Sequence, residues 1–351
     1  MIFDTPKMQA MRDKYCEIPN FQVPGIVALD REEELVKERA YLESLIASVK
    51  PAKQKEWLGR LLDESWSQYI GAWFEMMLYG WLQKVGEVEI EPEVEGDLPD
   101  FMLKLADQTI VVEAKVKTKP ELEQFKDDFI NTVREIKLPF AIYTQVMEFN
   151  TKLDIGFLIA KVSNWLENNP EEKFRYQDDS GNIIILIANY EPELPRIAFN
   201  TFSNFISPDF IKPSLSKKAK QHKRMRNAGC PYVIAILLYT SQVSPKSLAH
   251  AWFGKPEVVI DKHKKEILGV RHDMNGLHFH GEKIMHTSVS GTLVFNAFRD
   301  EDAKSRILVG WYIQNPFAKT PINPELFPVR ESYVIIEQTP EEVKMAWKSK
   351  I

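Results

Sequence analysis

The sequence predicts an α/β protein built on a mixed β-sheet that is flanked by helices. Two observations carry this prediction. Apolar residues change from helical spacing to strict alternation at Glu87, and an unbroken apolar run at 233–238 is typical of a strand buried on both faces. Of the 351 residues, 44% are hydrophobic and 27% are charged, which is the composition of a packed chain. This length suits one large domain or two of ordinary size.

Helices are expected in the N-terminal part of the chain. Residues 1–25 contain three prolines and show no clear period, so they predict an irregular lead-in. Asp30 is expected to cap a helix over residues 30–49. A second helical stretch is expected over residues 55–85, closed by Gly86.

Strands are expected from residue 87 onward. Apolar side chains alternate with polar ones there, which is the spacing of a half-buried strand. The patterns predict strands at 88–94, 101–105 and 110–116, a helix at 121–137, a strand at 140–146, a helix at 154–167, a hairpin of 174–176 with 183–187, a basic helix at 215–228, a buried strand at 232–239, a short helix at 245–253, a hairpin around Asn275-Gly276, strands at 287–298 and 307–313, and a loop at 315–328.

Acidic and basic side chains meet on two of these strands. Side chains alternate between the faces of a strand, so Glu113 and Lys115 are expected to project together. Asp100 begins the preceding strand, and a hairpin through residues 107–108 would bring it beside Glu113. Two carboxylates and the Ala114 carbonyl suit Mg²⁺ or Mn²⁺, which polarises a phosphate and activates a water. Since Lys115 can orient that water or neutralise charge in the transition state, the outline is a phosphodiester-hydrolysis site.

The Glu-x-Lys spacing alone is weak evidence because it occurs four times. Glu135 falls in a predicted helix, Glu171 in a turn and Glu342 in a polar C-terminal segment. Only Glu113 lies on an apolar strand downstream of a Pro-Asp pair. The alternative interpretation of the Glu113 group is a solvated face of the sheet.

A further acid lies in the predicted helix over residues 55–85. Glu75 is surrounded by large apolar residues at 73–79, where a carboxylate is costly unless it is paired, hydrogen-bonded or metal-bound. The alternative is a narrow polar stripe through Gln68, Glu75 and Gln83. Both interpretations of Glu75 stay open at this point.

A helix with an acid, followed by three strands that carry Pro-Asp and Glu-x-Lys, resembles the PD-(D/E)XK nuclease superfamily with its restriction-endonuclease-like fold. The resemblance covers about residues 55–117. It implies a metal-dependent nuclease, acting on DNA more readily than on RNA, whose catalytic residues are Glu75, Asp100, Glu113 and Lys115. Asp100, Glu113, Ala114 and Glu75 would hold the metal.

A helix and a strand complete the core in that superfamily, and two pairs could serve here: residues 121–146 or residues 215–239. We favour the second pair, since its helix carries Lys218 and Gln221, similar to the superfamily's lysine or glutamine near the phosphate. This choice predicts an N-terminal segment at 1–54, a core at 55–245 with an inserted α+β segment at about 118–212, and a β-rich extension with extra strands at 246–351, packed on the same domain.

The strongest candidate for a phosphate-binding surface is the basic run from Lys212 to Arg226, which contains no acid. Such contacts supply affinity without reading sequence. The alternative is a solvated helix face. The predicted nucleic-acid-binding residues are Lys217, Lys218, Lys220, Gln221, Lys223, Arg224 and Arg226.

Several other classes of function are disfavoured. The net charge of -5 argues against an overall positive surface, although not against a local basic patch. Cys16 and Cys230 lack the spacing of a zinc site, and alternation of His278 with His280 is weak evidence for one. No apolar run is long enough for a membrane helix and no secretory signal pattern begins the chain, so a cytoplasmic protein is expected. A non-catalytic nucleic-acid-binding or regulatory protein, an interaction scaffold and a homodimer all stay open.

Overall fold

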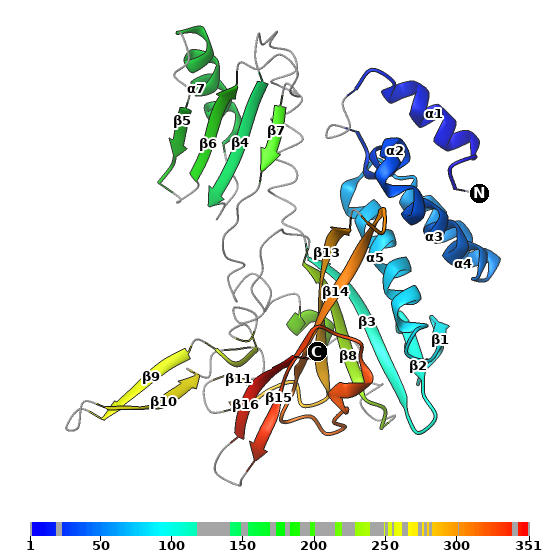
Figure 1. The fold of residues 1–351 in the computed structure, drawn as a ribbon, viewed down its shortest axis with the longest axis vertical. Helices are drawn as coiled ribbons and strands as arrows, with labels where there is room; N and C mark the ends of the chain where they lie inside the picture. Colours follow the sequence, from blue (N-terminus) through cyan, green and yellow to red (C-terminus); the bar gives the residue numbers. More distant parts are fainter. Residues whose placement is uncertain are drawn as a thin grey trace.

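The structure is a computed structural model. It describes residues 2–18, 23–117, 141–148, 154–168, 173–179, 183–189, 197–200, 215–219, 229–238, 249, 252–254, 256–261, 266–272, 276, 279–280, 283–300, 302–338 and 343–349. Within these residues the protein is mixed α/β, with a large mixed sheet flanked by helices, as predicted (Figure 1). None of the described helices is both long and apolar enough to cross a membrane.

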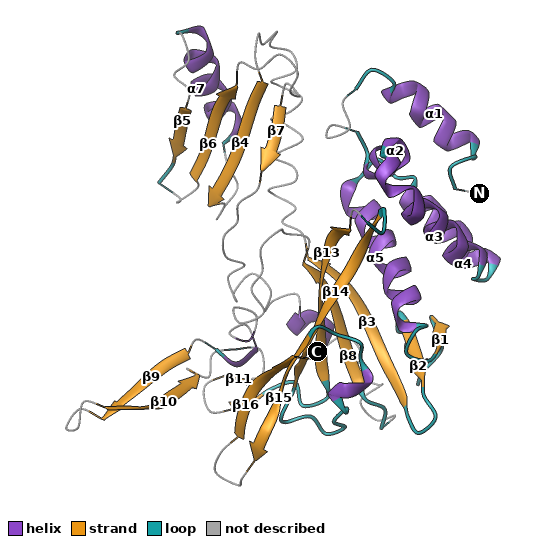
Figure 2. Ribbon diagram, in the orientation of Figure 1, coloured by secondary structure: helices purple, strands orange, loops and turns teal. Residues whose placement is uncertain are grey.

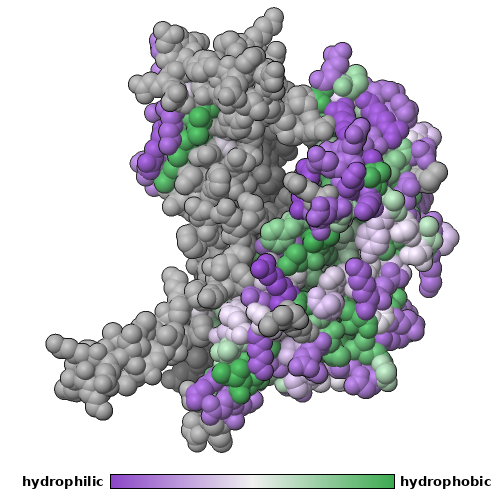
Figure 3. All heavy atoms as spheres, in the orientation of Figure 1, coloured by the Kyte–Doolittle hydropathy of each residue, from purple (hydrophilic) through white to green (hydrophobic). Residues whose placement is uncertain are grey.

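Five helices form the N-terminal part of the fold and cover one face of the large sheet (Figure 2). Their apolar side chains join a cluster with residues of the sheet, which leaves hydrophilic side chains on much of their outer surface (Figure 3). The helices are α1 (Pro6–Tyr15), α2 (Gly25–Arg31), α3 (Val36–Ala47), α4 (Pro51–Leu61) and α5 (Trp66–Leu82).

The large sheet has eight strands in the order β1-β2-β3-β8-β13-β14-β15-β16. β1, β2 and β3 form an antiparallel meander, whereas β8 runs parallel to both of its neighbours. The strands are β1 (Glu87–Ile90), β2 (Phe101–Lys104), β3 (Thr109–Lys117), β8 (Tyr232–Leu238), β13 (Gly291–Asp300), β14 (Ser305–Gln314), β15 (Glu331–Gln338) and β16 (Val343–Ser349). The three predicted strands before residue 118 are therefore confirmed.

Strand β8 is buried on both faces, as its unbroken apolar sequence predicts. Val233, Ala235 and Leu237 belong to the cluster beneath helices α2–α5. Ile234 and Ile236 belong to a second cluster on the opposite face. β8 pairs with β3 in the large sheet, whereas β4 belongs to a separate sheet, which agrees with the choice of the strand at 232–239. The assignment of residues 215–239 to a nuclease core stays a prediction.

A separate four-stranded sheet falls within the span predicted as an insertion. Its order is β5-β6-β4-β7, and helix α7 contacts β5. The expected hairpin and the helix capped by Asp154 are confirmed here, while the helix predicted at 121–137 lies outside the described residues. The elements are β4 (Ala141–Glu148), α7 (Ile155–Glu167), β5 (Lys173–Gln177), β6 (Ile183–Asn189) and β7 (Ile197–Asn200).

Two short antiparallel ribbons precede β13. They are β9 (Pro256–Asp261) with β10 (Glu266–His272), and β11 (Phe279–His280) with β12 (Lys283–Ile284). The hairpin predicted around Asn275-Gly276 falls largely outside the described residues and stays a prediction. The strands predicted near 287–298 and 307–313 are confirmed as β13 and β14, and residues 315–328 form a loop with one 3-10 turn (Pro324–Leu326).

The irregular lead-in predicted for residues 1–25 is wrong, because residues 6–15 form helix α1. The Thr5 hydroxyl accepts a hydrogen bond from the Met8 amide at 3.1 Å, and Pro6 occupies the first helical turn, where a missing N–H costs nothing. Met8 and Met11 are buried against the other helices. The prolines therefore begin a helix here instead of interrupting one.

Asp30 does not cap a helix, which corrects a second prediction. It lies inside α2, and its carboxylate accepts two hydrogen bonds of 2.8 Å from the Arg12 guanidinium. The helical stretch expected over 55–85 is also divided in two. Between α4 and α5, the Asp63 carboxylate accepts a hydrogen bond from the Ser65 amide at 2.7 Å, a local turn that competes with helical pairing.

Candidate active site

The β2–β3 hairpin places Asp100 next to Glu113, as the sequence predicts. Phe101 pairs with Val112 in the antiparallel register, so the residue before Phe101 lies beside the residue after Val112. One Asp100 oxygen, Oδ2, accepts a hydrogen bond from the Ala114 amide at 2.7 Å. The register and this hydrogen bond together fix the Asp100 carboxylate over β3.

Glu113 is more deeply buried than Asp100, with 1% of its side chain exposed. It shares the face of β3 with Val111, which belongs to the second apolar cluster. Its two flanking residues, Val112 and Ala114, belong to the first cluster on the opposite face. The predicted alternation on β3 is therefore confirmed, and it places a carboxylate among apolar side chains.

Lys218 brings a cation to these two carboxylates. Its Nζ lies 2.5 Å from Glu113 Oε2 and 3.6 Å from Asp100 Oδ2. Burial lowers the pKa of Lys218, but the adjacent Asp100 and Glu113 raise it more, so the ammonium stays charged. Lys218 comes from the helical turn at 215–219, whose Leu215 and Ala219 are buried in the second apolar cluster.

The Asp100 carboxyl group is shifted strongly toward its protonated form. Burial, followed by the neighbouring charge of Glu113, raises the pKa of Asp100 to about 7, although Lys218 opposes the shift. A hydrogen bond to Glu113 and the charge of Glu75 act in the same direction as burial. Burial and repulsion by Glu113 therefore outweigh the attraction of Lys218 at Asp100.

Lys115 follows on the same strand and is half-buried. Burial, with Lys218 and Lys217 nearby, lowers the pKa of Lys115. The effect of Lys217 and Lys218 on this pKa indicates that the three lysines lie near one another. Such a group of cations is suited to the non-bridging oxygens of a phosphate.

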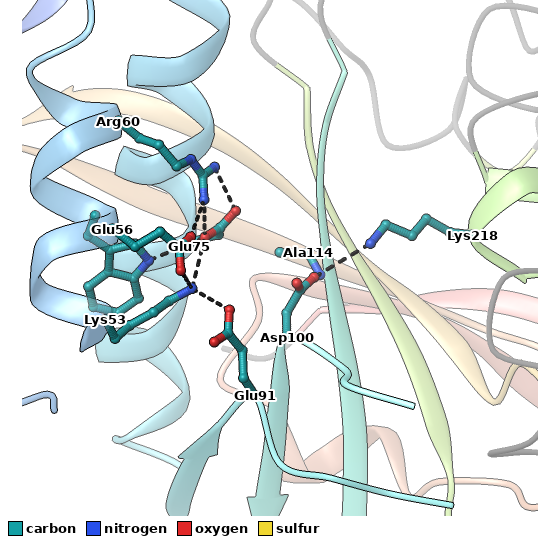
Figure 4. A network of polar contacts seen from close by, with 9 residues as sticks. Lys53, Glu56, Arg60, Glu75, Glu91, Asp100, Ala114 and Lys218 are labelled. Atoms are coloured by element: carbon teal, nitrogen blue, oxygen red, sulfur yellow. Dashed lines mark hydrogen bonds and ion pairs between the residues drawn. The ribbon is translucent and has the colours of Figure 1, made fainter. Parts of the chain in front are cut away.

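Glu75 faces a set of cations on helix α4 (Figure 4). Arg60 binds it with two hydrogen bonds of 2.7 and 2.8 Å, and the Trp57 indole donates a third at 3.2 Å. Lys53 lies 4.0 Å from the same carboxylate and also pairs with Glu56 and Glu91. The pairing expected for an acid in apolar company is thus present, while a role of Glu75 as metal ligand or catalytic residue stays a prediction.

Arg60 and Lys53 belong to the surroundings of this site, and sequence reasoning did not single them out. The signal was available, because Lys53, Glu56 and Arg60 follow one another at spacings of three and four residues, which places them on one face of α4. The contact of Lys218 with the carboxylates was also not predicted, since Lys218 was assigned to phosphate binding.

Of the predicted nucleic-acid-binding residues, the structure describes Lys217, which is exposed, and Lys218, which is part-buried. The remaining five lie outside the described residues: Lys220, Gln221, Lys223, Arg224 and Arg226. Their contribution to a basic surface stays a prediction.

The donor set can be tested for fit to a divalent cation. Within the described residues, no group of three or more His, Cys, Asp or Glu side chains is placed to hold a metal. Two adjacent carboxylates and the Ala114 carbonyl are nevertheless oxygen donors of the kind Mg²⁺ uses, and Mg²⁺ commonly keeps several waters as its other ligands. The repulsion that raises the pKa of Asp100 also favours an added positive charge. The residues therefore fit Mg²⁺ or Mn²⁺.

Comparison with known proteins gives no family for this chain: no protein-family model, no curated protein and no solved structure matches it. The function must therefore be argued from the site itself.

Proposed function

We propose that this chain is a metal-dependent nuclease that hydrolyses phosphodiester bonds, with DNA favoured over RNA. The observation that carries the proposal is the adjacency of Asp100 and Glu113, whose carboxylates the β2–β3 register brings together with Lys115 on the same strand. The meander β1-β2-β3 with parallel β8 beside it supports the proposal, because the resemblance implies three strands that a further helix and strand complete.

Each residue has a defined task in this proposal. Asp100, Glu113 and the Ala114 carbonyl would hold Mg²⁺ or Mn²⁺, which when bound polarises the phosphate and lowers the pKa of a water. Lys115 binds a non-bridging phosphate oxygen and offsets the charge that builds up there. Its lowered pKa makes proton exchange with a water at neutral pH easier than for an ordinary lysine. Lys217 and the basic run hold the nucleic-acid backbone.

A specific observation favours a second candidate, a nucleic-acid-binding or regulatory protein without turnover. Lys218 already contacts both carboxylates, and Arg60 already engages both oxygens of Glu75. The protein's own cations thus compensate the acids that a metal would otherwise neutralise. On this candidate, binding to polynucleotide is salt-dependent but no strand is cut.

The test is a cleavage assay of wild type beside Lys115→Ala on plasmid, single-stranded DNA and RNA, with Mg²⁺, Mn²⁺ or EDTA. We expect metal-dependent cutting by wild type and a loss of about 100-fold or more in Lys115→Ala, because a charge-stabilising group at the phosphate is removed. Gel electrophoresis reads the products.

The matched control is Lys104→Ala, which removes an exposed lysine from β2 of the same hairpin. It should cut within about twofold of wild type, since its ion pair with Glu89 is exposed and weak. Equal traces of cutting in wild type and Lys115→Ala, or no cutting in any metal, would transfer the proposal to the non-catalytic candidate.

A further inference from the structure

The Asp100–Glu113 pair poses a problem of charge balance. Two carboxylates lie side by side, and the side chain of Glu113 is almost fully removed from water. A buried charge is tolerated only where an opposite charge or several hydrogen bonds compensate it. The protein must therefore supply a cation of its own whenever no metal is bound.

Lys218 meets this need from a part of the chain far from the hairpin. Its ammonium contacts Glu113 Oε2 at 2.5 Å. It also approaches Asp100 Oδ2 at 3.6 Å (Figure 4), so one cation spans both acids. The helical turn that carries it is held by buried Leu215 and Ala219, and the Tyr232 hydroxyl donates to the Lys218 carbonyl at 3.3 Å. Packing thus holds the ammonium at the carboxylates.

We infer that Lys218 is an internal counter-ion of the Asp100–Glu113 pair, and that a divalent cation binds these carboxylates only by displacing the Lys218 ammonium. This inference rests on the metal site of the proposed function. An ammonium displaced in this way is free to pair with a phosphate bound at the site. Metal and phosphate binding are then coupled, and the coupling is reciprocal.

A purely structural ion pair makes the opposite prediction. If Lys218 only stabilised the fold, removing its charge would weaken or disorder the carboxylate pair, and metal affinity would stay the same or fall. If Lys218 competes with the metal, removing its charge leaves more negative charge at the two carboxylates, and metal affinity rises. The sign of the change in affinity therefore separates the two roles.

The experiment is a titration of the metal-free full-length protein with Mn²⁺ at about pH 8, in which electron paramagnetic resonance measures free Mn²⁺. We expect Lys218→Met to bind Mn²⁺ about tenfold more tightly than wild type, or better. The matched control is Lys104→Met, which removes the same charge from an exposed residue of β2. Its affinity should stay within about threefold of wild type, since water screens an exposed charge.

A second variant covers the case in which Lys218→Met does not fold. Lys218→Gln removes the charge but keeps a hydrogen-bond donor for Glu113, and it should show the same gain in affinity. Unchanged or weaker Mn²⁺ binding in the neutral variant that folds, or no Mn²⁺ binding in wild type and variant alike, would overturn the inference.

Cleavage is measured separately on the same samples. Tighter Mn²⁺ binding by Lys218→Met without any cutting by wild type would support the counter-ion and refute the nuclease. Cutting by wild type with unchanged Mn²⁺ affinity in Lys218→Met would support the nuclease and refute the counter-ion. The two proposals therefore fail independently.

Discussion

At the scale of single residues, Asp100 is where burial and charge act most strongly. Its carboxylate is held by the Ala114 amide, repelled by Glu113 and attracted by Lys218. A carboxyl group whose pKa is raised in the folded protein keeps a proton that the unfolded chain has already released. The free energy of unfolding must therefore depend on pH in a defined direction.

The pH dependence of stability tests this balance in the metal-free protein. The pKa of Asp100 rises from 3.8 to about 7 on folding, so its contribution is present below pH 4 and is lost as pH rises toward 7. With EDTA present, we expect the free energy of unfolding of wild type to fall across this window by about 1 to 3 kcal/mol relative to Asp100→Asn. Urea unfolding at several pH values measures it, and parallel pH profiles would contradict the assignment.

The sequence was sufficient to predict the part of the site that the β2–β3 hairpin forms. Alternation places Glu113 and Lys115 on one face, and a short turn brings Asp100 beside Glu113, so local rules decide these neighbours. The contact between Lys218 and Glu113 joins residues 105 positions apart. No local rule fixes that distance, because it depends on which helical turn packs against which face of the sheet.

At the scale of elements, the junction of α4 and α5 depends on the Arg60–Glu75 pair. Both oxygens of Glu75 accept hydrogen bonds from Arg60, with 18% of the glutamate side chain exposed. Removing Arg60 leaves Glu75 with the Trp57 indole at 3.2 Å and a distant Lys53. A part-buried carboxylate is costly in that state.

We therefore expect Arg60→Ala to lower the free energy of unfolding by about 1 to 3 kcal/mol. Lys104→Ala is the control, because it removes an exposed cation whose pair with Glu89 should contribute little to stability. Urea unfolding at neutral pH compares the two variants. Equal losses would mean that the Arg60–Glu75 pair is no stronger than a surface ion pair.

The spacing of apolar residues predicted well the strands that are defined by burial. It predicted poorly the helix ends that are defined by side-chain capping. β3 and β8 were predicted because the order of their apolar residues follows directly from which side chains are buried. Helix α1 was missed because its start depends on the Thr5 hydroxyl and on Pro6 in the first turn, and a proline-rich stretch more often indicates a loop. The division between α4 and α5 was missed for a similar reason, because it depends on the local turn that the Asp63 side chain forms.

At the scale of the whole molecule, a buried ion pair joins the N-terminal helices to the C-terminal strands. Glu38 of α3 is fully buried and binds the Arg306 guanidinium of β14, the Arg306 amide and the Trp73 indole. The guanidinium also lies over the Trp73 ring, 4.7 Å from its centroid, and donates to the Tyr69 hydroxyl. Segments 268 residues apart thus share one network.

Removal of this guanidinium should strongly destabilise the folded protein. We expect Arg306→Ala to lower the free energy of unfolding by about 3 to 5 kcal/mol, because it leaves a fully buried carboxylate without its cation. Arg299→Ala is a close control, since Arg299 pairs with Arg306 in the β13–β14 register but is 45% exposed and bonds Glu32 and Glu34 on the surface. That control should lose at most about 1 kcal/mol, as measured by thermal or urea unfolding.

Composition and length could not predict this connection. The sequence indicated extra strands after residue 246 but gave no neighbours for them, since strand order depends on long-range pairing. In the structure β13 pairs with β8 and continues the sheet that contains the candidate site. The N-terminal helices and strands β13 and β14 therefore stabilise the same core.

The parallel pairing of β3 with β8 has a consequence during synthesis. The ribosome completes β3 roughly 120 residues before β8, a delay of roughly 6 to 24 s at usual elongation rates. Until then the nascent chain exposes the nine-residue edge of β3, with Glu113 on it and Asp100 beside it but without Lys218. An unpaired edge of this kind invites pairing with other chains, and the two charges at Asp100 and Glu113 would discourage it. The same carboxylates can thus protect the unfinished chain from aggregation before the candidate site has formed.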